Sequence, residues 1–143
     1  MKQRVVELTE FGAAENMRLI EADIPIPGPG QIVVKNNAIG LNYLDTYFRS
    51  GLYPWPNQEN IKIPGSEGVG HVHAVGSDVT FHKEGDKVSY VTPVGAYAEY
   101  ALINAAHAVQ LKVEVNDHDV VASTLKGLTT HYLLHLTFKL ESG

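Results

Sequence analysis

Glycine, proline and aspartate interrupt the first hundred residues so often that only short strands fit between them. RVVELTE (4–10) and MRLIEADI (17–24) mix β-branched and alternating polar residues, as is typical of half-buried strands. The same pattern predicts further strands at 32–41, 69–76, 87–92, 95–103 and 107–111. About seven to nine strands in about 110 residues predict a small, mostly antiparallel β-barrel or sandwich.

Two proline-rich stretches separate these strands. IPIPGPGQ (24–31) has fixed φ angles that favour an extended entry into the next strand. A proline-recognition ligand is the alternative, but the stretch lies between two predicted strands. GLYPWPNQENIKIP (51–64) is predicted to be a loop.

Helical signals occur in two places. Residues 43–50, YLDTYFRS, place Leu44, Tyr47 and Phe48 at helical spacing, and Gly51 is well placed to end that helix. Near the C-terminus, Asn116 or Asp117 can cap a helix that begins DHDVVASTLK. The following GLTTHYLLHLTFKL continues helically up to the final residues 141–143, and Gly127 predicts a break between two helical segments. The chain therefore divides into a β-domain, 1–115, and a helical segment, 116–143.

Composition excludes several classes of function. The chain has 143 residues and a net charge of −5, with scattered Lys and Arg, so it has no basic surface for nucleic acid. No apolar run approaches the ~20 residues that span a bilayer, and the N-terminus has no signal-peptide pattern. The chain contains no cysteine, which excludes disulfides and thiolate metal sites and suits a reducing compartment. We expect a cytoplasmic protein of one main domain.

Three patterns resemble functional motifs without fitting them. GSEGVG (65–70) has the wrong glycine spacing for a dinucleotide-binding loop, and a predicted strand follows it where a helix should open. His71 with His73, and His131 with His135, could each supply two metal ligands, but neither pair has an evident third. The sequence therefore predicts turn glycines and packed or surface imidazoles at these positions, and no metal site.

The stretch GLNYLDTYFRSGLYP (40–54) concentrates aromatic and hydrogen-bonding side chains. The side chains of Asn42, Tyr47 and Tyr53 could line a slot for a planar ring and donate hydrogen bonds to its carbonyl. The residue types alone favour the simpler interpretation, in which the rings pack against the β-domain. Lys126 before Gly127 interrupts an apolar helix, and it could either approach a phosphate or mark a helix break.

As an ordered set, these motifs resemble the medium-chain dehydrogenase/reductase superfamily. They are PxPGPGQIVVK, AIGLNYLDTYFRSGLYP, IPGSEGVGHVHAVG, GDKV, GAYAEY and LKGLTTHYLL. NYLDTYFRSGLYP and LKGLT are most similar to the zinc-free quinone oxidoreductase (zeta-crystallin-like) branch. This resemblance implies a GroES-like β-barrel catalytic domain that acts with NADPH on a quinone or a similar small carbonyl acceptor.

The resemblance also implies roles for particular residues. Zinc alcohol dehydrogenases of the superfamily have a Cys about where Asn42 stands and a His where Ser66 stands, so no zinc is expected. The positions that line the nicotinamide and substrate cleft in the family match Asn42, Tyr47 and Tyr53, which are therefore the expected catalytic residues. The expected cofactor-binding residues are Asn42, Asp45, Tyr47, Lys126 and Thr129.

In the family, a Rossmann domain with an AAAGGVG-type turn follows directly after the position of residue 143. The resemblance therefore implies the catalytic domain without the Rossmann domain, and an isolated chain with little or no activity. Two alternatives stay open. One is a free-standing GroES-like binding module that could self-associate through exposed apolar surface, and the other is part of an enone or enoyl reductase of the same superfamily.

Overall fold

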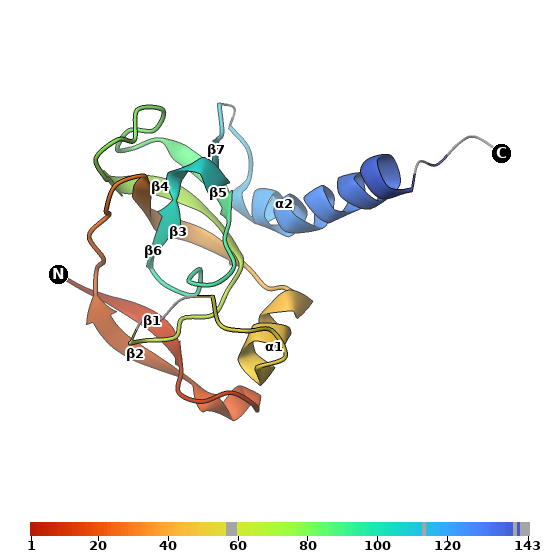
Figure 1. Ribbon diagram of the computed structural model, residues 1–143. Coiled ribbons are helices and arrows are strands. Elements are labelled where there is room, and N and C mark those ends of the chain that lie inside the picture. The colour runs from red at the N-terminus through yellow and green to blue at the C-terminus, as the bar shows by residue number, and fades with distance from the viewer. Residues whose placement is uncertain (57–59, 113, 139, 141–143) are drawn as a thin grey trace.

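The computed structural model of the chain describes residues 1–56, 60–112, 114–138 and 140 (Figure 1). Residues 57–59 of the predicted loop and residues 139 and 141–143 of the predicted helical segment lie outside this description. The described residues form seven strands in two sheets, and every strand pair is antiparallel. The mainly β fold with C-terminal helices that the sequence predicts is thus confirmed.

The smaller sheet is a two-stranded hairpin. It pairs β1 (Lys2–Leu8) with β2 (Met17–Asp23), and the 3₁₀ turn η1 (Ala14–Asn16) leads into the second strand. Strand β1 buries Gln3, Val5 and Leu8, and it leaves Lys2 and Arg4 exposed.

The larger sheet carries the core. It has the strand order β6-β3-β4-β5-β7. These strands are β3 (Gln31–Gly40), β4 (Glu67–Val75), β5 (Lys87–Val91), β6 (Tyr100–Asn104) and β7 (Ala108–Gln110). Their buried side chains include Ile32, Val34, Val72, Val88 and Tyr90, which form one continuous cluster.

The strand predicted at 95–103 is shorter than expected. Only its second half pairs as β6, because the backbone before it bends to serve buried polar groups. The side-chain amide of Asn36 donates to the carbonyl oxygens of Ala96 (3.2 Å) and Ala98 (2.9 Å), and Tyr97 N donates to Pro64 O at 2.9 Å. An isolated bridge between Val5 and Ala98 joins this segment to the smaller sheet.

Both predicted helix starts are confirmed, but the predicted break is wrong. Helix α1 spans Tyr43–Ser50 and ends at Gly51, whose φ of 78° is the left-handed conformation that glycine adopts without strain. Helix α2 (Asp117–His131) begins at Asn116, whose side-chain oxygen accepts from the backbone N–H groups of His118 and Asp119. It continues through Gly127, since one helical glycine costs only about 1 kcal/mol relative to alanine.

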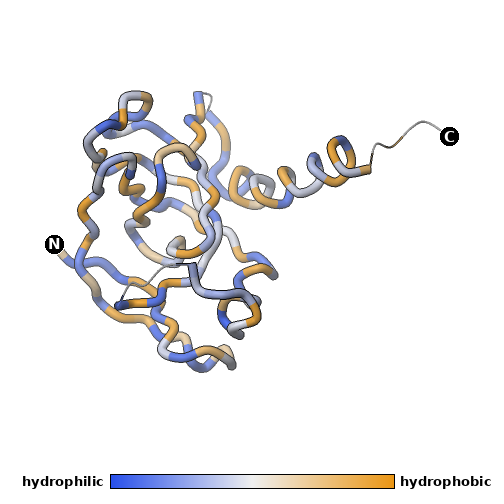
Figure 2. Tube along the Cα trace, in the orientation of Figure 1, coloured by the Kyte–Doolittle hydropathy of each residue, from blue (hydrophilic) through white to orange (hydrophobic). Residues whose placement is uncertain are grey.

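The C-terminal helix projects from the β-domain (Figure 1). The first part of α2 lies against β3, β4 and β5. The helix continues into the π-helical turn η3 (Tyr132–Thr137). Earlier in the chain, a short 3₁₀ turn, η2 (Ala105–His107), precedes β7. Apolar segments recur along the projecting part in Figure 2. The exposed apolar side chains there are Leu128, Tyr132, Leu133, Leu134, Leu136, Phe138 and Leu140. Within the described residues, no helix has the length and apolar character that crossing a bilayer requires.

Candidate functional site

The aromatic stretch 40–54 forms a compact cluster around α1. The ring centroids of Tyr47 and Tyr53 are 5.3 Å apart, and Tyr53 N donates to Tyr47 O at 3.1 Å. Phe48 is buried and meets Tyr53 and Trp55 edge-on. Phe48 therefore packs in the interior, as the simpler interpretation expects. Tyr47 and Tyr53 lie together nearer the surface, where a binding slot would need them.

Asp45 is a buried carboxylate that holds together three segments of the chain. It accepts hydrogen bonds from the backbone N–H of Asn42 (2.9 Å) and the hydroxyl of Tyr97 (2.8 Å), and a short one from the hydroxyl of Ser66. These donors come from the start of α1, the segment before β6 and the segment before β4. Since buried polar atoms are costly when unpaired, this network fixes the N-terminus of α1 against the sheet.

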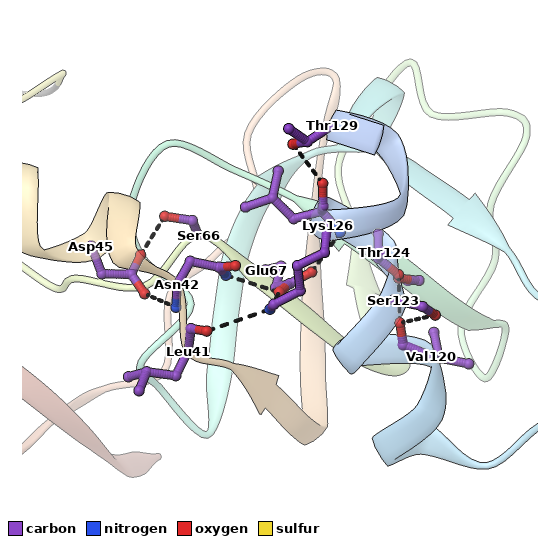
Figure 3. Close-up of polar contacts among 12 residues, drawn as sticks. Leu41, Asn42, Asp45, Ser66, Glu67, Val120, Ser123, Thr124, Lys126 and Thr129 are labelled. Carbon is purple, nitrogen blue, oxygen red and sulfur yellow. Dashed lines mark hydrogen bonds and ion pairs between the residues drawn. The ribbon is translucent and has the colours of Figure 1, made fainter. Parts of the chain in front are cut away.

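Glu67 is a second buried carboxylate, with 0% of its side chain exposed. Its Oε1 accepts from Asn42 Nδ2 at 2.8 Å and from Lys126 Nζ at 2.7 Å, and its Oε2 accepts from the Leu125 backbone N–H at 2.8 Å (Figure 3). Gly40 makes room for it, because a Cβ at that position would lie 2.3 Å from Glu67 Oε1. Glu67 thus joins β4 to the loop before α1 and to α2.

The structure brings most of the expected site residues into two groups. Asn42 bonds Asp45 directly and is connected to Lys126 through Glu67, while Tyr47 lies with Tyr53. Thr129 lies one turn beyond Lys126 on α2, is exposed, and donates to the Leu125 carbonyl at 2.8 Å. Glu67 and Tyr97 escaped the sequence analysis, although an acidic residue inside the glycine- and valine-rich GSEGVG is a signal of a buried, partnered carboxylate.

The two positions at which zinc dehydrogenases carry Cys and His lie side by side. Asn42 and Ser66 both donate to Asp45, so hydrogen bonds connect the two segments at this point (Figure 3). Across the described residues, no three histidine, aspartate or glutamate side chains gather closely enough to hold a metal ion.

A large apolar groove runs from α1 to α2. Its volume is about 790 Å³, and Tyr53 lies at its border together with Leu44 and Phe48 of α1. The opposite wall comes from α2, through Val120, Thr124 and other side chains. The groove therefore begins next to the tyrosine pair and follows the surface between the sheet and α2.

Two tyrosines, Tyr90 and Tyr97, make the stability of the fold depend on pH in the alkaline range. Burial raises the pKa of Tyr90, and burial together with the Asp45 carboxylate raises the pKa of Tyr97, in both cases above the usual 10.0. Because the unfolded chain ionises these phenols at lower pH than the folded chain, their contribution to stability is complete below pH about 10 and is lost as the pH rises above it.

We therefore expect a spectrophotometric pH titration to show two of the seven tyrosines ionising only as the chain unfolds. Tyr97→Phe retains the ring and should leave one such tyrosine. If all seven phenols ionise together near pH 10 while the circular dichroism stays native, the buried hydrogen bonds of Tyr90 and Tyr97 are not as described.

Comparison with known proteins places this geometry in a family. Residues 28–113 match the "Alcohol dehydrogenase GroES-like domain" family. The quinone oxidoreductase of Pseudomonas aeruginosa is 43% identical over 142 residues, which cover 96% of this chain and 42% of that protein. The predicted resemblance to quinone oxidoreductases is thereby confirmed.

Solved structures agree. A quinone oxidoreductase of Pseudomonas syringae pv. tomato superposes with a TM-score of 0.92 at 42% identity, covering 100% of this chain and 43% of that one. The Escherichia coli quinone oxidoreductase complexed with NADPH gives a TM-score of 0.85 at 35% identity, covering 99% and 42%. The chain thus spans less than half the length of these proteins. It belongs to the alcohol dehydrogenase GroES-like domain family.

Proposed function

We propose that this chain contains the catalytic domain of an NADPH-dependent quinone oxidoreductase that works without zinc. The observation that carries the proposal is the contact of Tyr47, on α1, with Tyr53, which follows the end of that helix; α1 itself begins directly after Asn42, whose backbone and side chain are both hydrogen-bonded to buried carboxylates. The similarity to quinone oxidoreductases, one of them solved with NADPH, supports it.

The chemistry fits the available donors. NADPH, when bound, supplies the reducing equivalents, and negative charge then develops on the oxygens of the quinone. The phenol hydroxyls of Tyr47 and Tyr53 and the amide of Asn42 can donate hydrogen bonds to such an oxygen, and the rings can stack on a planar acceptor. A quinone needs no deprotonation before it accepts electrons, so a Lewis-acid metal is not required.

The cofactor-binding residues are proposed on the same basis. Asn42 and Tyr47 would contact the nicotinamide end, and Asp45 would act by holding Asn42, because its own carboxylate is buried and already accepts three hydrogen bonds. Lys126 and Thr129 are one turn apart on α2 but do not line the groove, so they are proposed as cofactor-binding residues from the family resemblance alone.

The division into a catalytic β-domain, 1–115, and a connecting helical segment, 116–143, is also a proposal. Because the chain spans 42% of the P. aeruginosa enzyme, we propose that turnover needs polypeptide of the kind found in the other part of that enzyme. A cytoplasmic location and assembly into homo-oligomers remain predictions.

A chimera tests the proposal. Residues 1–143 would be joined to the remaining part of the P. aeruginosa quinone oxidoreductase at the end of the aligned region, and NADPH oxidation would be followed with a series of quinones. We expect quinone-dependent oxidation by the chimera and none by residues 1–143 alone. A chimera that folds cooperatively and binds NADPH but reduces no quinone would overturn the proposal.

Single hydroxyl deletions identify the donors. In the chimera, Tyr47→Phe and Tyr53→Phe retain the stacking ring but remove one donor each, so we expect kcat to fall by about 10- to 100-fold. Tyr43→Phe is the matched control, because Tyr43 belongs to the same helix, is 76% exposed and meets Tyr47 only by its ring edge. Equal kcat values in all three variants would show that the hydroxyls of Tyr47 and Tyr53 do not donate to the acceptor.

A second candidate is a free-standing binding module. It is favoured by the run of exposed apolar side chains along the end of α2 and η3. Sedimentation velocity of residues 1–143 separates the two candidates: concentration-dependent self-association that Leu136→Lys abolishes favours the binding module, while a monomer favours the enzyme domain. The enone reductase alternative predicts faster turnover of α,β-unsaturated ketones than of quinones by the chimera.

A further inference from the structure

We propose that Glu67 is a positioning residue that sets the orientation of the Asn42 amide and that Lys126 balances its charge. This inference rests on the proposed function, because it concerns the amide assigned to the acceptor and nicotinamide site. It changes the role expected for Lys126 from a contact with the cofactor to a contact with Glu67. The sequence pattern assigned no role to Glu67.

Three donors converge on the two oxygens of Glu67. They are the Asn42 side-chain amide, the Lys126 ammonium and the Leu125 backbone N–H, all at 2.7–2.8 Å. Figure 3 shows the carboxylate between the loop of Asn42 on one side and α2 on the other. Since the Glu67 side chain is wholly buried, its oxygens depend on these protein donors, among which the Lys126 side chain is partly exposed.

The carboxylate determines which way the amide faces. An ionised carboxylate only accepts hydrogen bonds, so the NH₂ group of Asn42, and not its oxygen, must point toward Glu67. The backbone of the same residue is held by Asp45 through its N–H. With both ends fixed, the amide cannot flip, and the second hydrogen of Nδ2 is presented in one direction as a donor.

Lys126 makes this arrangement compatible with the chemistry. An unbalanced buried carboxylate would oppose the negative charge that develops on an acceptor oxygen nearby. The ammonium of Lys126 lies 2.7 Å from Glu67 Oε1 and also reaches the Leu41 carbonyl oxygen at 3.4 Å. The pair therefore fixes the amide while adding no net charge beside the site.

Glu67→Gln in the chimera is the main test. Glutamine has the same shape but only one acceptor oxygen for the three donors, so at least one of them loses its partner and the amide of Asn42 can flip. We expect kcat to fall at least about 10-fold, with the KM for the quinone changed less than kcat, because a misplaced group costs most in the transition state.

Asp117→Asn is the matched control. Asp117 also ties α2 to the sheet by an ion pair, to Lys87 at 2.6 Å, but it contacts no residue of the proposed site. If Asp117→Asn lowers kcat as much as Glu67→Gln does, the pair acts only by fastening α2, and the inference is overturned. A kcat that falls only in Glu67→Gln supports positioning.

A spectroscopic test is independent of activity. In ¹⁵N-labelled residues 1–143, the side-chain NH₂ hydrogens of Asn42 should exchange with water more slowly than those of exposed Asn60, and Glu67→Gln should abolish the difference. Equal exchange for the two asparagines in the unsubstituted chain would overturn the inference. If the unsubstituted chimera is inactive but Asn42 is protected, the proposed function fails while the arrangement of Glu67 and Asn42 stands.

Discussion

Gly70→Ala is expected to lower the free energy of unfolding by at least about 3 kcal/mol. A Cβ on Gly70 would lie 2.0 Å from Lys35 O and 2.9 Å from Asn36 Cα, both backbone atoms of the neighbouring strand β3. Strand β3 has a register irregularity next to this pair, between Asn36 and Ala38, which brings the two backbones together. Neither backbone can move away without breaking the pairing on either side.

The displacement would also disturb buried hydrogen bonds. The Asn36 side chain donates to the Ala96 and Ala98 carbonyl groups and accepts from the Tyr90 hydroxyl at 2.9 Å. Steric overlap in a packed interior costs about 1–3 kcal/mol or more, and loss of these bonds adds to it. Against a typical total stability of about 5–15 kcal/mol, we expect a loss of at least about 3 kcal/mol.

Urea unfolding monitored by circular dichroism measures this loss. Gly127→Ala is the matched control, since nothing lies within 4 Å of a Cβ at that helical position, and alanine should stabilise the helix by about 1 kcal/mol. A Gly70→Ala chain with the unfolding midpoint of the unsubstituted protein would show that β3 and β4 do not pair in this register.

Lys126→Met is expected to destabilise the fold by about 2 kcal/mol. It leaves Glu67 buried without its cation, a change that costs about 3–5 kcal/mol for fully buried pairs. The Lys126 side chain is 47% exposed, so water can take over part of its role and the smaller value applies. The Asn42 and Leu125 donors remain and limit the loss further.

A double-mutant cycle measures the energy of the Glu67–Lys126 ion pair separately from any other effect of the two substitutions on α2. Glu67→Gln combined with Lys126→Met should cost less than the sum of the two single variants, with a coupling of about 1 kcal/mol or more. Lys2→Met is the control, because the Lys2–Asp23 pair is largely exposed and should contribute almost nothing. Additive costs for Glu67 and Lys126 would show that the ion pair does not couple the two residues.

The sequence predicted those elements whose signals are local. The helix at 43–50, its end at Gly51 and the start of α2 at Asn116 each depend on one or two neighbouring residues, and the structure has all three. The break expected at Gly127 was wrong, because the cost of one helical glycine is small beside the hydrogen bonds of a continuous helix. The sequence predicted a strand over the whole of 95–103. It could not show that the backbone of the first half bends to accept hydrogen bonds from the Asn36 side chain, about 60 residues away.

The candidate site divides in the same way. The residue types marked Asn42, Tyr47 and Tyr53 as possible hydrogen-bond donors but alone favoured simple packing of the rings, and the family resemblance is what selected these residues as catalytic. Lys126 could equally have met a phosphate or marked a helix break. Its contact with Glu67, 59 positions earlier in the chain, exists only where α2 lies against the start of β4.

The sequence by itself determined the strand-rich fold, the short aromatic helix and the family resemblance, because alternation, helix caps and motifs each depend on residues that are close together in the chain. Only the tertiary structure decided that Asn42 is held by two buried carboxylates and that Lys126 is paired with one of them. Such partners are set by strand register and helix docking, which depend on burying the whole core at once and leave no periodic signal in the chain.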